Sequence, residues 1–138
     1  MRPGMTPERP TIHHSVQTVT WKTWGEEVLL AHAPGLYTLK LLKRYAAGQR
    51  GGLQFHHFKH ETFHLLSGEV DVYFVDVSFG ALRVHRMFPG ETFIVPPGAI
   101  HSVQTVTDSV MVEASTPVFD DRENVEADYD ISTAVAWP

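Results

Sequence analysis

Residues 52–68 read Gly-Leu-Gln-Phe-His-His-Phe-Lys-His-Glu-Thr-Phe-His-Leu-Leu-Ser-Gly. The stretch holds four histidines, a glutamate and a glutamine among apolar residues that favour strands, and a glycine stands at each end. Aromatic and aliphatic runs bounded by glycine are typical of short strands between turns. We therefore expect two strands, over residues 53–58 and 61–66, joined by a tight loop. A purely structural hairpin needs no such concentration of imidazole and carboxylate groups.

Short strands with turns between them are predicted along most of the chain. Glycine and proline supply the turns, for example at Pro89-Gly90 and Pro96-Pro97-Gly98. No apolar period of 3.6 residues lasts for three turns before residue 120, so we expect few helices, confined to the tail. Many short strands with this punctuation indicate a sandwich or a barrel. The further predicted strands span residues 18–30, 36–42, 70–75, 81–88, 91–95, 101–106 and 109–115.

The composition fits one globular domain that acts on small molecules. The 138 residues are 43% hydrophobic and 20% charged, which is enough to bury a core. A net charge of −5 without a run of lysine or arginine argues against nucleic acids and anionic membranes as partners. Cysteine is absent, so a metal ion would have to bind histidine, carboxylate or amide oxygen.

The chain divides into three predicted parts. Residues 1–17 begin with several prolines and are expected to form a flexible lead-in, residues 18–118 the barrel, and residues 119–138 an acidic arm that packs on or near it. The carboxylates of the arm are interpreted as solvated. No apolar run has the length of a signal peptide or a membrane span, so a soluble, cytoplasmic protein is expected.

The alternation of a strand places a row of polar side chains on one face. Gln54 and His56 share that face, while His57 points the other way. A tight loop would bring Glu61 back beside His56, and His101 follows a Pro-Pro-Gly turn as a possible third contribution. The face is a candidate ligand row; a polar barrel mouth without a metal ion is the alternative.

Two motifs in this chain resemble those of the cupins, a family of small β-barrels. The second cupin motif, G-x5-P-x-G-x2-H-x3-N, is matched by Gly90, Pro96, Gly98 and His101, and Thr105 stands in place of the final asparagine.

The first cupin motif, G-x5-H-x-H-x(3,4)-E-x6-G, is matched by His56, Glu61 and Gly68, with Gln54 in place of the first histidine. The resemblance implies an all-β, cupin-type jelly-roll β-barrel, or double-stranded β-helix, with few helices. It also implies one divalent transition metal ion per chain, Zn, Mn, Fe or Ni. The ligands it implies are Gln54, His56, Glu61 and His101.

Among cupins, the chain is most similar to the type II phosphomannose isomerases. Their core, L-Q-x-H-x-H-R-x-E-H-W, resembles residues 53–63, and their late D-D-x-x-R-x-E-D-x-Y-G-R resembles residues 120–131. Phe58 stands where that family has histidine, Lys59 where it has arginine and Asn124 where it has a second arginine. The departures leave open whether the sugar is phosphorylated, because arginine binds phosphate as a fork.

The resemblance implies an aldose–ketose isomerase that acts on a sugar or sugar phosphate through a metal-stabilised enediolate. Lys59 and His57 are the candidates for proton transfer, with His60 as a further one. A metal-dependent dioxygenase or lyase is the first alternative, to be distinguished by oxygen uptake of the iron form. A sugar-binding or regulatory module without catalysis is the second. Exposed strand edges predict a homodimer, which light scattering would check.

Overall fold

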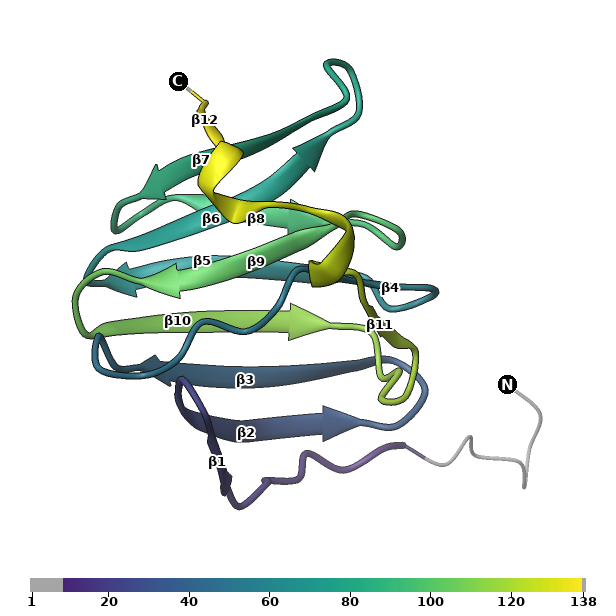
Figure 1. Ribbon diagram of the computed structural model, residues 1–138. Coiled ribbons are helices and arrows are strands. Elements are labelled where there is room, and N and C mark those ends of the chain that lie inside the picture. Colours follow the sequence, from purple (N-terminus) through teal and green to yellow (C-terminus); the bar gives the residue numbers. More distant parts are fainter. Residues whose placement is uncertain (1–8, 138) are drawn as a thin grey trace.

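The computed structural model describes residues 9–137 (Figure 1). Residues 1–8 of the predicted lead-in and residue 138 lie outside this range, and residues 9–17 are exposed and adopt no regular secondary structure. The strands are β1 (Thr18–Lys22), β2 (Gly25–Ala33), β3 (Tyr37–Arg44), β4 (Gln54–His56), β5 (Glu61–Ser67), β6 (Val70–Asp76), β7 (Ala81–Met87), β8 (Thr92–Val95), β9 (His101–Thr105), β10 (Ser109–Ser115), β11 (Arg122–Asn124) and β12 (Val135–Ala136).

The strands form two six-stranded sheets, and the predicted all-β jelly-roll barrel is confirmed. The first sheet has the order β1-β2-β3-β10-β5-β8 and the second the order β11-β4-β9-β6-β7-β12. Two single turns of 3-10 helix, η1 (Glu126–Asp128) and η2 (Ile131–Thr133), are the helices of the described chain, and both lie in the tail as predicted. Within residues 9–137, no helix is long and apolar enough to cross a membrane.

The C-terminal arm contains two strands that the sequence did not predict. Figure 1 shows the arm, in yellow, running across the second sheet from β11 to β12. β11 pairs with β4 and β12 pairs with β7, so the arm supplies both edge strands of this sheet. Their polar or very short sequences lack an alternating pattern, and pairing with the barrel makes them strands. The predicted homodimer stays a prediction.

The inward face of the first sheet changes from apolar to polar along its central strands. Met111 of β10 lies opposite Leu42 of β3 and Leu65 of β5, and all three are in the buried core. Further along the same face of β10, Ser115 lies opposite Glu61 of β5. Because side chains alternate along a strand, one face carries both the core and a polar cavity wall.

Candidate metal centre

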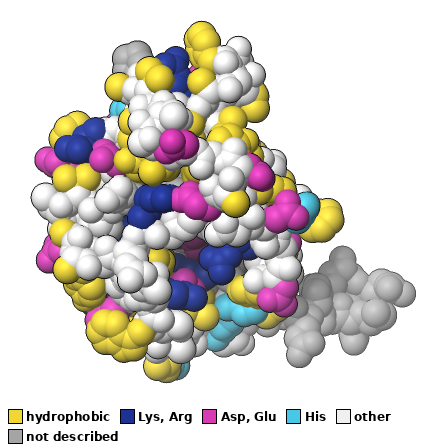
Figure 2. Space-filling view, viewed as in Figure 1, with side chains coloured by type: hydrophobic (Ala, Val, Ile, Leu, Met, Phe, Trp, Pro, Cys, Tyr) yellow, Lys and Arg dark blue, Asp and Glu magenta, His cyan; other side chains and the backbone are white. Residues whose placement is uncertain are grey.

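A cavity of about 760 Å³ occupies the polar end of the barrel. Both sheets and the C-terminal arm contribute to its wall, which includes Gln54, His56, Lys59, Glu61 and His101. Figure 2 shows acidic and basic side chains gathered around a hollow near the centre of this face. All four predicted ligands, and one of the three candidates for proton transfer, Lys59, therefore line a single cavity.

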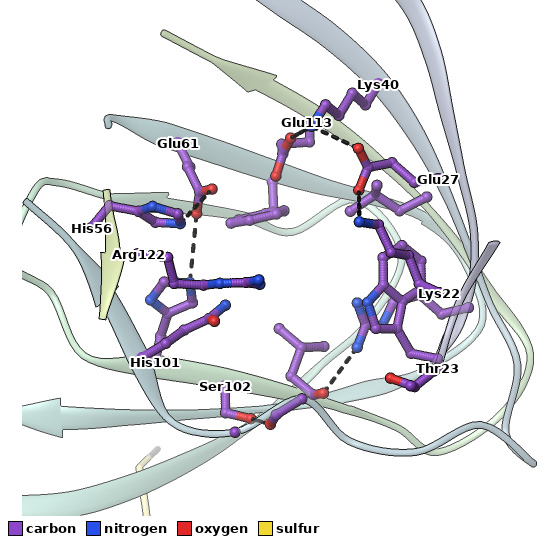
Figure 3. Close-up of a pocket in the computed structure, with 18 of the residues that line it drawn as sticks. Lys22, Thr23, Glu27, Lys40, His56, Glu61, His101, Ser102, Glu113 and Arg122 are labelled. Atoms are coloured by element: carbon purple, nitrogen blue, oxygen red, sulfur yellow. Dashed lines mark hydrogen bonds and ion pairs between the residues drawn. The ribbon is translucent and has the colours of Figure 1, made fainter. Parts of the chain in front are cut away.

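Glu61 is the point on which the predicted ligands converge. Nε2 of His56 lies 3.2 Å from Oε1 of Glu61, and Nε2 of His101 lies 3.5 Å from Oε2. The three side chains come from β4, β5 and β9 (Figure 3). Gln54 lies opposite His101 in the pairing of β4 with β9. The tight loop between β4 and β5 returns Glu61 to the side of His56, as the sequence predicted.

Hydrogen bonds determine which nitrogen of each histidine carries the proton. Nδ1 of His56 lies 2.8 Å from a carboxylate oxygen of Asp121, and Nδ1 of His101 lies 3.0 Å from the carbonyl oxygen of Ala99. Both partners can only accept, so each neutral ring donates from Nδ1 and keeps a lone pair on Nε2. Both lone pairs then face the carboxylate of Glu61. This is the arrangement in which a second hydrogen bond orients a metal-binding imidazole.

The donor atoms around Glu61 fit a divalent transition metal ion. Oε2 of Glu61 is buried without a hydrogen-bond partner among the described residues. Two imidazole lone pairs and a carboxylate repel each other unless a cation lies among them. For metal–ligand bonds of about 2.1 Å, neighbouring ligand atoms are about 3.0 to 3.4 Å apart, which is close to the spacing seen around Glu61.

The ligands do not yet enclose a metal ion. Nζ of Lys59 lies 3.4 Å from Oε1 of Glu61, and this lysine is buried. Within residues 9–137, no three His, Asp or Glu side chains are placed so that they could hold a metal ion as they stand. Burial opposes ionisation of Glu61, but a hydrogen bond from His101 in its protonated form, the ammonium of Lys59 and the charge of a protonated His56 outweigh it and lower the pKa of its carboxyl. A metal ion bound at Oε1 would therefore compete with the ammonium of Lys59, whereas Oε2 has no hydrogen-bond partner among the described residues.

Asp121 holds one side of the centre in place. Its Oδ1 accepts from His56, and its Oδ2 accepts from the backbone N–H groups of Phe58 and Lys59 at 2.6 and 2.8 Å. The side chain is only 8% exposed. Burial alone would raise the pKa of Asp121, but the two backbone donors and His56 lower it to about 2. The interpretation of the arm's carboxylates as solvated is wrong for this residue, because the arm folds back over the β4–β5 loop.

Replacing Asp121 with asparagine is expected to weaken metal binding by about tenfold. Asparagine keeps one acceptor oxygen in place of two, so either His56 or the loop loses its partner. Competition with a chromophoric chelator measures the affinity. The depressed pKa also means that the stability supplied by Asp121 is present above pH of about 4 and lost as the pH falls toward 2.

Asp120→Asn is the matched control for this substitution, because Asp120 is the next residue in the chain and its side chain is exposed. It should bind metal as the unaltered protein does. Equal affinities for the two variants would show that Asp121 does not orient His56 for a metal ion.

The other predicted proton-transfer residues lie outside the cavity wall. His57 is half exposed, and its Nε2 lies 3.8 Å from Glu123 on the outer surface. His60 is also exposed. Lys59, by contrast, lines the cavity beside Glu61. Strand alternation already separated His57 from the ligand row.

Arg122 was not predicted and lies at the cavity mouth. It lies opposite His56 in the pairing of β11 with β4, and Figure 3 shows its side chain extending between Glu61 and His101. Among residues 9–137, it forms no ion pair. The family segment that residues 120–131 resemble has its arginine at the position of Asn124, so the resemblance did not point to Arg122.

The cavity wall is more cationic than the chain as a whole. It contains five Lys or Arg side chains and three carboxylates, an excess of two positive charges in a chain of net charge −5. Such a wall raises the local concentration of anionic ligands. The cations are Lys22, Lys40, Arg44, Lys59 and Arg122, and the carboxylates are Glu27, Glu61 and Glu113.

A family model described as "Cupin domain" matches residues 41–115. This range contains the four predicted ligands and the strands β4 to β10 that position them. No curated protein matches the chain.

Solved structures share the fold at low sequence identity. The capsular polysaccharide assembling protein CapF from Staphylococcus aureus is 20% identical with a TM-score of 0.67, over 81% of this chain and 33% of CapF. KdgF from Halomonas sp. is 22% identical with a TM-score of 0.57, over 69% of this chain and 80% of KdgF. Oxalate decarboxylase from Bacillus subtilis, a protein with Mn(II) centres, is 16% identical with a TM-score of 0.61, over 72% of this chain and 27% of that protein. The chain thus spans about a third of the length of CapF.

Proposed function

Because this chain belongs to the cupin family, we propose that it is a metal-dependent enzyme, an aldose–ketose isomerase that acts on a sugar or sugar phosphate. The observation that carries the proposal is the convergence of His56 and His101 on Glu61 inside a cavity with an excess of positive charge. CapF, which shares the fold, is named for capsular polysaccharide assembly, and this supports a carbohydrate as the substrate class.

Each residue of the centre has a role in this proposal. Gln54, His56, Glu61 and His101 would hold one divalent transition metal ion, and oxygen and nitrogen donors of this kind suit Zn, Mn, Fe or Ni. When bound, the ion supplies Lewis acidity toward the adjacent carbonyl and hydroxyl oxygens of an open-chain sugar. Lys59, displaced from Glu61, would place its ammonium where negative charge develops on the substrate.

Arg122 supports an anionic form of the substrate. A guanidinium with no ion-pair partner within residues 9–137 can donate two parallel hydrogen bonds to a phosphate. Its position at the cavity mouth would let it hold a phosphate while the sugar carbonyl reaches the metal centre. Lys59 and Asn124 stand where the family has arginine. Arg122 of β11 would thus take over the contact with the phosphate.

Metal-loaded protein assayed against free and phosphorylated hexoses and pentoses tests the function. We expect at least one phosphorylated aldose to be converted to its ketose. Arg122→Gln should raise KM for that phosphate by about tenfold or more, the loss of a charge-assisted pair, while kcat changes less.

Arg86→Gln is the control for Arg122, because Arg86 is exposed and forms ion pairs with Asp71 and Glu69 on the outer surface. Failure of the metal-loaded protein to interconvert any sugar in the panel would remove the isomerase proposal. Conversion with an unchanged KM in Arg122→Gln would leave the isomerase and remove the phosphate contact.

A further inference from the structure

Glu113 is a buried carboxylate that the metal centre does not use. It lies at the middle of β10 on the inward face, between the apolar core and the polar end of the barrel. Its side chain lines the cavity and is 8% exposed. Oε2 has no hydrogen-bond partner among the described residues. An unsatisfied buried carboxylate is costly, so a site that keeps one invites a functional explanation.

The ion pair with Lys40 does not account for Glu113. Nζ of Lys40 lies 3.9 Å from Oε2 of Glu113 but 2.8 Å from Oε1 of Glu27. Glu27 is therefore the closer partner of the Lys40 ammonium. Oε2 of Glu27 also lies 3.9 Å from Nζ of Lys22. Figure 3 shows these side chains as a connected row along one wall, with Glu113 at the end nearest Glu61. A long, buried pair of this kind contributes little to stability.

We propose that Glu113 is the catalytic acid–base of this cavity and carries a proton between two adjacent carbons of the substrate. This rests on the proposed isomerase function. The proposed function assigns Glu61 to the metal ion, because its carboxylate faces His56 and His101, so it is not the proton carrier. His57 and His60 lie outside the cavity wall. Among the carboxylates that line the cavity, Glu113 is the one with neither a close cation nor a ligand role.

The proton transfer balances without an added reactant. The carboxylate of Glu113 takes the proton from the carbon that bears the hydroxyl next to the aldehyde. That C–H bond breaks and an O–H bond forms on Glu113. The C–H electron pair becomes the carbon–carbon double bond, and the π pair of the aldehyde moves onto its oxygen, which gives an enediolate. Glu113 then returns this proton, or one exchanged with solvent, to the former aldehyde carbon. The hydroxyl proton moves from one substrate oxygen to the other, and the ketone carbonyl forms. The aldose has become a ketose, and Glu113 is again ionised.

The charges around Glu113 suit both halves of this step. Burial, with help from Glu61 on β5 and Glu27 on β2, raises the pKa of Glu113 to about 7, although Lys59 and Lys40 act in the opposite direction. Acid and base forms are then both populated near neutral pH, as a group that accepts and returns a proton requires.

Hydrogen exchange with solvent tests the role of Glu113 directly. Unaltered protein and Glu113→Gln are loaded with the same metal ion and incubated in D₂O with glucose 6-phosphate, mannose 6-phosphate or ribose 5-phosphate. Proton NMR follows deuterium entering the carbon next to the carbonyl. We expect exchange with the unaltered protein and a loss of about a hundredfold or more in Glu113→Gln, which is the usual contribution of a general base. Metal content and KM should stay the same.

Glu113→Asp and Glu69→Gln complete the experiment. The aspartate keeps a carboxylate and should restore part of the exchange, with an acid limb in its pH–rate profile that Glu113→Gln lacks. Glu69 is a surface residue that pairs with Arg86, so its substitution is the control for a change from glutamate to glutamine. Full exchange in Glu113→Gln would overturn the assignment and leave the isomerase standing. An unaltered protein that neither isomerises nor exchanges would remove the proposed function and the role of Glu113 together.

Discussion

Replacing His101 with alanine is expected to remove the bound metal ion, from about one ion per chain to none. His101 provides one of the two imidazole nitrogens that face Glu61, and the carbonyl of Ala99 holds its ring in the metal-binding tautomer. Without it, the centre keeps one imidazole, one carboxylate and an amide oxygen. Lys59, 3.4 Å from Glu61, can then neutralise that carboxylate in place of a metal ion.

Metal analysis of protein purified without chelator or a metal-affinity tag measures this effect, before and after reconstitution with Zn, Mn, Fe or Ni. His60→Ala is the control, because His60 is exposed in the loop that precedes Glu61. It should retain its metal ion. If even the unaltered protein holds no metal ion after reconstitution, Gln54 marks a centre that has lost its metal. The sugar-binding module without catalysis would then be the better interpretation.

Replacing Glu113 with glutamine is expected to stabilise the protein increasingly as the pH rises from about 4.5 to about 7, and fully above that, although it removes the proposed proton carrier. The native state keeps the proton of Glu113 up to a pKa of about 7, whereas the unfolded chain releases it near the ordinary value of 4.5. As the pH rises between these values, the unfolded state alone gains the charge, so the unaltered protein loses stability. At about 1.4 kcal/mol for each pKa unit, the loss reaches at most about 3 kcal/mol.

Urea unfolding at a series of pH values measures the difference between the two proteins. The free energies of unfolding should agree near pH 4, and Glu113→Gln should become the more stable by about 1–3 kcal/mol at pH 8. Glu69→Gln should show no such crossover, because Glu69 is a surface residue. A variant that is less stable than the unaltered protein at pH 8 would show that the ion pair with Lys40 stabilises the fold. That result would argue for a structural role of Glu113.

Local patterns in the sequence predicted the barrel and brought together the residues that converge on Glu61. Strand alternation and glycine–proline turns located β3 and β5 to β10 to within about two residues, because these signals act between near neighbours. The same alternation separated His57 from Gln54 and His56. The spacing of His101 after its Pro-Pro-Gly turn pointed to the third contribution, which the structure places beside Glu61.

Only the tertiary structure decided what surrounds those residues. Asp121, Arg122 and Glu113 lie far along the chain from His56, and no local pattern distinguishes them from solvated charges. Asp121 and Arg122 reach the centre because β11 pairs with β4, and Glu113 because β10 lies between β3 and β5. Pairing between distant strands depends on the whole fold, and it determines burial and the charges nearby. Burial and those charges, in turn, set the protonation of a carboxylate, so the chemistry of the cavity follows from the tertiary structure.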